Sequence, residues 1–346
     1  MHISVMLQKL GCNLFRTHDA SIASLAAYAS STKEVVYHDI TSRDNAAAPR
    51  CDIYMSGAPC PAFSTAGKGG GLSDPRGSVL LHSVDYVLTQ TPRVAFFENV
   101  KGLVNKRNRP VLDALAEVLR SAGYSVKAKV LDTCTHGAIP HHRPRVFVVA
   151  VLKSRLGAPF VWPTCLPCHS FDRFLVNNVS QEESVSPGRR ENIEAAWKIA
   201  KKKFQEAGYT KRNAMLICDA HAGKGFLSVM LNVSPCLTKA RAGNNGHYLM
   251  SLKRWMNVWE IAALQGWPKP MVDDLLQNFS KSEIGATLGD GFSISLVMRI
   301  SGRALVAAGL VPSFEDQWEL TPPSGHLPDA VYKIRDPTHE RTAVWA

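Results

Sequence analysis

The chain has 346 residues, of which 45% are hydrophobic and 20% are charged, and this ordinary globular composition argues against a disordered protein. Forty Lys and Arg residues against 29 Asp and Glu residues give a formal charge of +11, which suits a polyanionic partner such as nucleic acid, although basic proteins without one are common. The longest apolar run, Val146–Leu152, is far shorter than the roughly 20 residues of a membrane-spanning helix, so no membrane segment is expected.

Eight cysteines are scattered along the chain, and Gln8 and Lys9 interrupt the only apolar stretch near the N-terminus. We therefore expect reduced thiols and an intracellular protein, in the nucleus of a eukaryote or the cytoplasm of a prokaryote. Cys165-x-x-Cys168-His169 has the spacing of metal ligands. Because no second pair at ligand spacing follows, the sequence predicts no metal site.

Short β-rich runs occur at residues 35–37, 53–55, 94–97 and 146–151, and stretches with helical periodicity separate them. This alternation predicts an α/β fold with a parallel sheet. Between the third and fourth runs, Pro110–Arg120 places its apolar residues on one helical face, and Gly123 follows as a stop signal. We expect a crossover helix there.

The sequence pattern changes after Lys153, where Pro, Cys, Asn and Ser become frequent. A basic, helix-like stretch at 197–204 and a glycine-bearing segment at 220–246 predict a second, smaller domain. Lys201 to Lys203 could follow a phosphate backbone, although a solvated helix face explains them equally well. From Arg254 helical patterns return, and a long apolar helix is expected within 284–305, whereas the Pro-rich residues after Pro312 show no periodicity.

Cys60 stands out because of its surroundings. The run at 53–55 leads into a Gly and Pro turn that leaves Cys60 at the carboxyl end of a strand, where ligands bind in open α/β sheets. A lone cysteine is usually a small buried apolar residue. Here Pro59 and Pro61 stiffen the turn, and the stretch 63–77 has the glycine content of a mobile polar lid. We therefore predict a reactive thiol.

Pro59–Gly77 contains Pro-Cys-x-x-Phe-Ser, then Ala-Gly-Lys, a glycine and Asp-x-Arg-Gly. This segment resembles the nucleophile loop of cytosine-C5 DNA methyltransferases, with Pro61 where that family usually has Gln or Asn. Four more blocks in the family's order resemble its Glu-Asn-Val, Gln-x-Arg-x-Arg, Arg-x-Leu-Thr-x-Arg-Glu-x-x-x-Leu-Gln-Gly-Phe-Pro and Gly-Asn-Ala-Val motifs; they are Phe96–Leu103, His136–Val149, Arg254–Pro268 and Ile284–Ser293. His141 stands in place of Gln, and Asp290 in place of Asn.

The resemblance implies a Rossmann-like S-adenosylmethionine-dependent methyltransferase sheet with a smaller target-recognition domain. Its implied parts are the first catalytic part at 1–152, the target-recognition domain at 153–250, the second catalytic part at 251–310 and an irregular tail at 311–346. The implied reaction is methyl transfer to C5 of a cytosine that is swung out of double-stranded DNA. The implied catalytic residues are Cys60, which adds to C6, Glu98 at the N3 and N4 edge, Arg145 at O2 and Arg143 as a support of the loop.

The same resemblance implies a cofactor site for S-adenosylmethionine, to which we assign Asp39, Asp19, Pro59 and Asp290. Asp39 corresponds to the residue that meets the adenine, and Asp19 lies two residues beyond Thr17, which takes the place of the acid that binds the ribose. The family's Phe-x-Gly-x-Gly turn is missing, since Gly11 is the only glycine before Asp39. We therefore expect a shortened or diverged N-terminus that binds the cofactor weakly.

Two alternatives remain open. A tRNA cytosine-C5 methyltransferase is the first, although that branch typically has Thr where this chain has Ser64. A DNA-binding relative that has lost the cofactor site and catalysis is the second.

Overall fold

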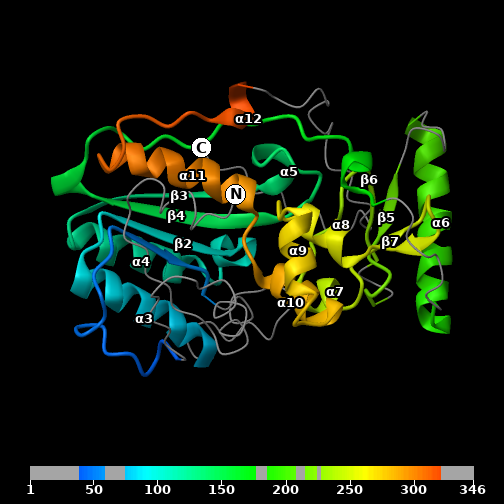
Figure 1. Ribbon diagram of the computed structural model, residues 1–346, viewed down its shortest axis with the longest axis horizontal. Coiled ribbons are helices and arrows are strands. Elements are labelled where there is room, and N and C mark those ends of the chain that lie inside the picture. The colour runs from blue at the N-terminus through cyan, green and yellow to red at the C-terminus, as the bar shows by residue number, and fades with distance from the viewer. Residues whose placement is uncertain (1–38, 59–74, 177–184, 208–214, 224–226, 321–346) are drawn as a thin grey trace. The chain divides into compact units, whose positions relative to one another are not determined.

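A computed structural model describes residues 39–58, 75–176, 185–207, 215–223 and 227–320 (Figure 1). The chain divides into two compact units. The first comprises Pro144–Cys165, Leu296–Thr321 and the described part of residues 1–132, and the second comprises Thr133–Arg143 and the described part of residues 166–295. The predicted run at 35–37 lies outside the described residues.

The first unit holds a four-stranded sheet in the order β1-β2-β4-β3. Its strands are β1 (Ile53–Ser56), β2 (Val94–Val100), β3 (Tyr124–Asp132) and β4 (Pro144–Leu152). β1 and β2 are parallel, but β4 runs antiparallel to both β2 and β3. The three described runs predicted from sequence are confirmed as strands, whereas the expected parallel sheet is mixed.

Helices cover both faces of this sheet (Figure 1). On one face, α3 (Pro75–Gln90) and α4 (Arg109–Ser121) pack against the side chains of Tyr54, Phe97 and Val148 in one apolar cluster. On the other face, Ala304 and Leu305 of α11 (Ile294–Ala307) lie against Ile53, Val94 and Phe96. Since successive strand residues point to opposite faces, odd-numbered residues of β2 face α3 and α4, and even-numbered residues face α11.

Short elements complete the first unit: η3 (Lys101–Val104), η4 (Lys153–Arg155) and α12 (Gln317–Leu320). Asp316 and Glu319 hold α12 to α11, because Arg299 donates to Asp316 at 2.8 Å and to Glu319 at 2.7 Å. The Arg299 side chain is completely buried, and Arg303 contacts the same two carboxylates. Residues 311–320, expected to be an irregular tail, are thus an ordered part of the unit; residues 321–346 lie outside the described residues.

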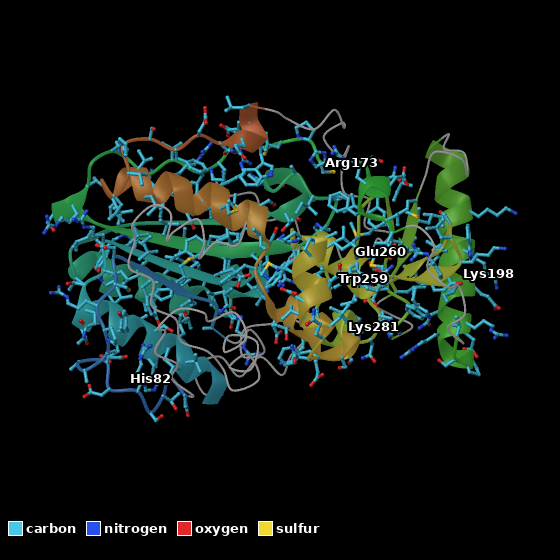
Figure 2. The ribbon with its side chains drawn as sticks, in the orientation of Figure 1. His82, Arg173, Lys198, Trp259, Glu260 and Lys281 are labelled. Atoms are coloured by element: carbon cyan, nitrogen blue, oxygen red, sulfur yellow. The ribbon has the colours of Figure 1, made fainter. Side chains whose placement is uncertain are left out.

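The second unit has a smaller antiparallel sheet in the order β6-β5-β7-β8. Its strands are β5 (Leu216–Cys218), β6 (Val229–Leu231), β7 (Tyr248–Leu249) and β8 (Arg254–Trp255). The basic stretch at 197–204 lies in α6 (Pro187–Ala207), which packs Ile193, Ala196 and Ala200 against this sheet. Burial of this apolar stripe leaves Lys198 on the exposed side of α6 (Figure 2).

The remaining helices of this unit are α5 (Thr133–His136), η5 (Phe171–Phe174), α7 (Lys239–Ala242), α8 (Val258–Ala263), α9 (Lys269–Leu275) and α10 (Lys281–Asp290). α7 and α10 approach closely at Gly289, where a Cβ atom would lie 2.6 Å from backbone atoms of Thr238 and Lys239. Only a residue without a side chain fits there.

Several details differ from the sequence predictions. β3 was not predicted, and the last three residues of the expected lid at 63–77 form the first turn of α3. The compact units also group the chain differently from the predicted domains, because Thr133–Arg143 and residues 251–295 belong to the second unit. The division by role into 1–152, 153–250, 251–310 and 311–346 stays a prediction.

Among the described helices, none is both long enough and apolar enough to cross a membrane.

Candidate active site

The most distinctive polar contact of the first unit joins Glu98 of β2 to Arg145 of β4. The Nε atom of Arg145 lies 3.1 Å from Oε1 of Glu98, and the two side chains are only 11% and 7% exposed. A buried carboxyl group costs several kcal/mol unless it has a partner, so the contact with Arg145 compensates the burial of Glu98 among apolar neighbours.

The strand register explains the pairing. Arg145 lies directly opposite Val100, and Glu98 precedes Val100 by two residues, so the two charged side chains are diagonal neighbours on the same face of the sheet. That face is the one that α11 covers further along β2. The predicted catalytic residues Glu98 and Arg145 are therefore brought together, as their positions in two separate sequence blocks required.

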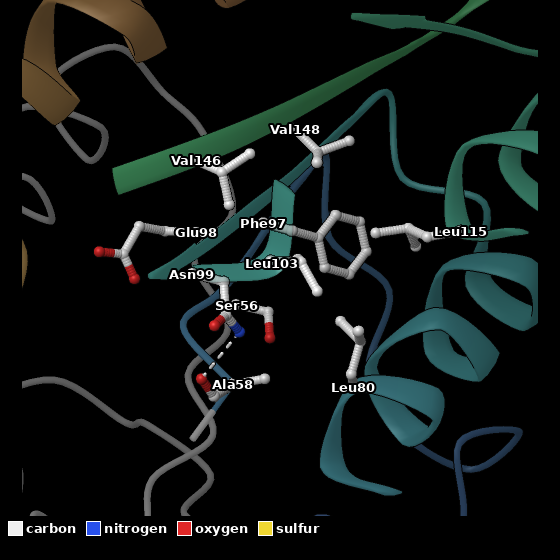
Figure 3. A pocket seen from close by; sticks show the side chains of 10 residues that line it. All are labelled: Ser56, Ala58, Leu80, Phe97, Glu98, Asn99, Leu103, Leu115, Val146 and Val148. Carbon is white, nitrogen blue, oxygen red and sulfur yellow. Dashed lines mark hydrogen bonds between the residues drawn. The ribbon is translucent and has the colours of Figure 1, made fainter. Parts of the chain in front are cut away.

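A small cavity lies at the carboxyl ends of β1 and β2, lined mainly by side chains from the face of the sheet that α3 and α4 cover (Figure 3). Its walls are mostly apolar, with Phe97, Leu103 and Leu115 among them, and Figure 3 shows the carboxylate of Glu98 directed away from these side chains. Asn99 and Ser56 are the other polar side chains of the lining. The amide of Asn99 donates to the Ala58 carbonyl at 3.3 Å.

Three predicted site residues, Cys60, Pro59 and Asp19, lie outside the described residues. Ala58, which directly precedes Pro59, lies two residues past the end of β1. The role of Cys60 stays a prediction.

Arg143, predicted to support the catalytic loop, lies in the second unit. It directly precedes β4, which begins at Pro144, so Arg143 is not part of the strand that carries Arg145. Its buried guanidinium donates to the carbonyls of Leu237 at 2.8 Å, Gly289 at 3.1 Å and Gly291 at 2.7 Å. Within the second unit, Arg143 thus ties together the ends of two helical segments.

His141, which stands in place of a glutamine of the family block, belongs to the same unit as Arg143. Its side chain is fully buried. Its Nε2 accepts from the Leu237 amide at 3.1 Å, and its Nδ1 lies 3.0 Å from the Leu264 carbonyl. Because Nε2 accepts, the proton resides on Nδ1 and the ring is neutral. His141 therefore joins two loops, as a glutamine amide would.

Two of the assigned cofactor residues are described, one in each unit. Asp39 is exposed and accepts from both the amide and the hydroxyl of Thr41, which lowers the pKa of its carboxyl group. Asp290, the last residue of α10, pairs with Lys239 at 2.9 Å. Both carboxylates thus already have partners within the chain, and the assignment of Asp39 and Asp290 to the cofactor site stays a prediction.

The block at 254–268 forms a connected structure in the second unit. Glu260 binds Arg254 through both carboxylate oxygens, at 2.6 and 2.9 Å, and accepts from the amides of Asn257 and Val176. Asn257 closes a capping box at the start of α8, on which Trp259 neighbours Glu260 (Figure 2). The retained Arg and Glu of this block therefore hold the structure together.

Sequence reasoning missed a polar cluster in the second unit. Asp219, which follows β5, pairs with Arg241 at 2.8 Å and lies 3.8 Å from Nδ1 of His247. His247 is fully buried, and burial lowers its pKa to about 4, with smaller effects from Asp219, His141 and Arg241. Asn192 of α6 holds the loop after β5 through the carbonyls of Ala220 and Ala222. Arg241 lies in the glycine-bearing segment at 220–246, but no motif in the sequence marked Asn192, Asp219 or His247.

A comparison with protein-family models identifies the family of the chain. The model described as C-5 cytosine-specific DNA methylase matches residues 3–300. The chain belongs to this family. The cytosine-C5 methylase match covers all five sequence blocks, and it ends before α12.

Curated relatives agree with this assignment. The type II methyltransferase M.NgoBI of Neisseria gonorrhoeae is 26% identical over 298 residues, which cover 85% of this chain and 87% of that protein. M.HpaII of Haemophilus parainfluenzae is 30% identical over 186 residues, or 53% of this chain and 51% of the relative. The match to M.HgiCII of Herpetosiphon aurantiacus, 35% identical over 111 residues, covers 32% of this chain and only 25% of that protein.

Solved structures support the fold. A methyltransferase of Entamoeba histolytica, EhMeth, superposes with a TM-score of 0.57 at 17% sequence identity. The superposition covers 84% of this chain and 89% of the EhMeth chain. A DNMT2 mutant of Spodoptera frugiperda gives a TM-score of 0.55 at 16% identity, covering 86% and 94%. The predicted α/β methyltransferase fold is confirmed.

Proposed function

We propose that this chain transfers a methyl group to C5 of cytosine in double-stranded DNA. The observation that supports this most directly is the Glu98–Arg145 ion pair at the end of the sheet, beside the segment that leads from β1 to Cys60. A carboxylic acid and a guanidinium side by side complement one edge of cytosine. The acid can bond N3 and the N4 amino group while the guanidinium binds O2.

In the proposed reaction, the thiolate of Cys60 forms a bond to C6 of the base, and the electron pair of the C5–C6 double bond moves to C5. C5 then takes the methyl group. A base removes the C5 proton, the sulfur–carbon bond breaks, and the thiolate of Cys60 is regenerated. Glu98 and Arg145 stabilise the charge that the ring gains while sulfur is attached, which is where such contacts contribute most.

S-adenosylmethionine would supply the methyl group as an electrophilic sulfonium, as it does in this family. We assign its contacts to Asp39, Asp19, Pro59 and Asp290. The sequence before Asp39 has a single glycine where a close backbone approach needs two, so we expect weak binding by this chain. Titration calorimetry of the purified protein with the cofactor tests this, and a micromolar dissociation constant would contradict it.

Double-stranded DNA is the proposed substrate, and the formal charge of +11 is consistent with a polyanion. The tRNA enzyme and the non-catalytic relative predict different outcomes in one experiment. Tritiated methyl transfer is measured on duplex DNA and on tRNA in parallel. Label in DNA alone supports the proposal, label in tRNA alone supports the first alternative, and DNA binding without label supports the second.

Duplex DNA containing 5-fluorocytosine tests the covalent step, because fluorine at C5 cannot leave as a proton would and the adduct is trapped. The wild-type chain should be trapped in the presence of cofactor, and Cys60→Ala should not. Cys165→Ala is the matched control, since Cys165 is exposed and is not among the predicted catalytic or cofactor-binding residues. Equal trapping of wild type and Cys60→Ala would refute the assignment of the nucleophile.

A further inference from the structure

Asn99 is a buried amide whose hydrogen bonds reach toward the nucleophile. Its side chain is 3% exposed. The Nδ2 atom donates to the Ala58 carbonyl at 3.3 Å, and the Oδ1 atom accepts from the Val100 amide at 2.9 Å. One side chain therefore binds the end of its own strand, β2, and the segment that leaves the neighbouring strand, β1.

The segment after β1 is held at a second point. Ser56, the last residue of β1, is hydrogen-bonded to Ser83 of α3 at 2.9 Å, and the Ser83 hydroxyl donates to the Val79 carbonyl at 3.0 Å. Ser56 is therefore the donor in the first bond. The chain is thus fixed to a helix at Ser56 and to a strand at Ala58, and Cys60 follows two residues later.

Asn99 and Glu98 act on different faces of the sheet. Glu98 shares a face with Arg145, whereas Asn99 lies opposite Val146, whose side chain belongs to the cluster formed with α3 and α4. A side chain on that face is not placed to contact the base edge that Glu98 and Arg145 would hold. Its described contact is with the backbone of the segment that leads to Cys60.

We propose that Asn99 is a positioning residue for Cys60, fixing the height and direction at which the chain leaves β1. This inference rests on one part of the proposed function, which is that Cys60 is the nucleophile. A misplacement of about 1 Å at a reacting atom costs up to about a hundredfold in rate. Loss of the amide should therefore lower kcat by about 10- to 100-fold and leave KM for DNA within about threefold.

An aspartate at this position gives a sharper test. Asn99→Asp removes the donor and sets a carboxylate against the Ala58 carbonyl, within two residues of the thiol. A negative charge this close disfavours a thiolate, so the pH midpoint of Cys60 alkylation should rise by about one unit. Asn99→Ser, which is smaller and uncharged, should slow alkylation severalfold without that shift, and it carries the test if Asn99→Asp does not fold.

The experiment measures iodoacetamide alkylation of Cys60 against pH, read peptide by peptide by mass spectrometry, with urea unfolding of each variant alongside. Asn108→Asp is the matched control, because Asn108 is also buried and donates to a backbone carbonyl, that of Gly102, at 3.0 Å. This control should leave the Cys60 profile unchanged.

Wild-type alkylation profiles in both Asn99 variants, with only a loss of stability like that of the control, would overturn the inference. The alkylation readout needs no methyl transfer. A shifted profile in a protein that methylates nothing would therefore refute the proposed function and leave the role of Asn99 supported.

Discussion

Two arginines that stand two positions apart in the chain are used in opposite ways in the two units. Arg145 in the first unit faces a single carboxylate, Glu98, at the end of a sheet. Arg143 in the second unit is enclosed by three backbone carbonyls and is only 2% exposed. The first guanidinium has a partner that is itself ionisable, and the second is bound to groups that cannot change their charge.

This difference bears on function. An ion pair at the end of a sheet can exchange its hydrogen bonds with those of a ligand, because both of its members are charged side chains that a ligand can replace as partner. A guanidinium enclosed by carbonyls holds loops together, and exchanging those bonds would leave buried carbonyls unsatisfied. A block with two similar arginines thus contributes one residue to proposed chemistry and one to the fold.

The largest effect is expected at Glu98. Glu98→Gln keeps the shape of the side chain and a hydrogen bond to Arg145 but removes the ionisable carboxyl group. Turnover on DNA should fall at least about a hundredfold, whereas duplex affinity should change little. Methyl-transfer kinetics beside a binding titration would measure this.

Arg93→Gln is the control for Glu98→Gln, because Arg93 pairs with Asp52 in a half-buried ion pair at the other end of β2. It should retain wild-type turnover. Full activity of Glu98→Gln would contradict the role assigned to the pair.

Arg143→Met tests the other side of the comparison. It removes the donors to three carbonyls, and we expect a loss of roughly 3 kcal/mol in the free energy of unfolding. Urea unfolding measures it. Arg109→Met should change stability by less than about 0.5 kcal/mol, because the pair of Arg109 with Asp113 is exposed. Equal effects of the two substitutions would show that the carbonyl contacts contribute little.

The cluster around His247 predicts a pH dependence of the second unit. The pKa of His247 is lowered to about 4 by burial, so the folded chain keeps this ring neutral while the unfolded chain takes up a proton below about 6.5. The stability contributed by His247 is therefore complete above about pH 6.5 and is lost as the pH falls toward 4, by up to about 3 kcal/mol. His247→Asn should flatten this part of a stability-against-pH curve measured by urea unfolding. An unchanged slope would refute the assignment.

The smallest effect is expected on α6. Replacing Lys201, Lys202 and Lys203 by Gln should reduce the salt dependence of DNA binding, with a slope change of about one for each phosphate that α6 no longer neutralises. Lys129→Gln, an exposed position on β3, is the control for a simple change of charge. If the triple variant and the control show the same small change, α6 does not follow phosphates.

The sequence predicted the first unit better than the second. Apolar runs marked β1, β2 and β4, and the one-sided periodicity of Pro110–Arg120 marked α4. β3 was missed because Ser125, Lys127 and Lys129 alternate along an edge strand, which reads as a polar connection. The direction of β4 cannot be read from its composition.

The candidate site was predictable only where local sequence patterns marked its residues. Glu98 and Arg145 carry block signatures, and strand register then makes them neighbours. The role of Arg143 depends on carbonyls 94 to 148 residues away, and no local pattern encodes such contacts. The Asp219 cluster likewise joins a strand end, a four-residue helix and a loop, each unremarkable alone.

The Arg299 contacts have a consequence for anyone who trims this chain. The family match ends at residue 300, which makes that residue an obvious place to cut. Such a fragment would keep Arg299 and discard Asp316 and Glu319, the acids that neutralise its completely buried guanidinium. A soluble expression product would need about twenty more residues than homology suggests. The charge of Arg299 in α11 is thus balanced by acids that lie beyond the family boundary, at the start of α12 and within it.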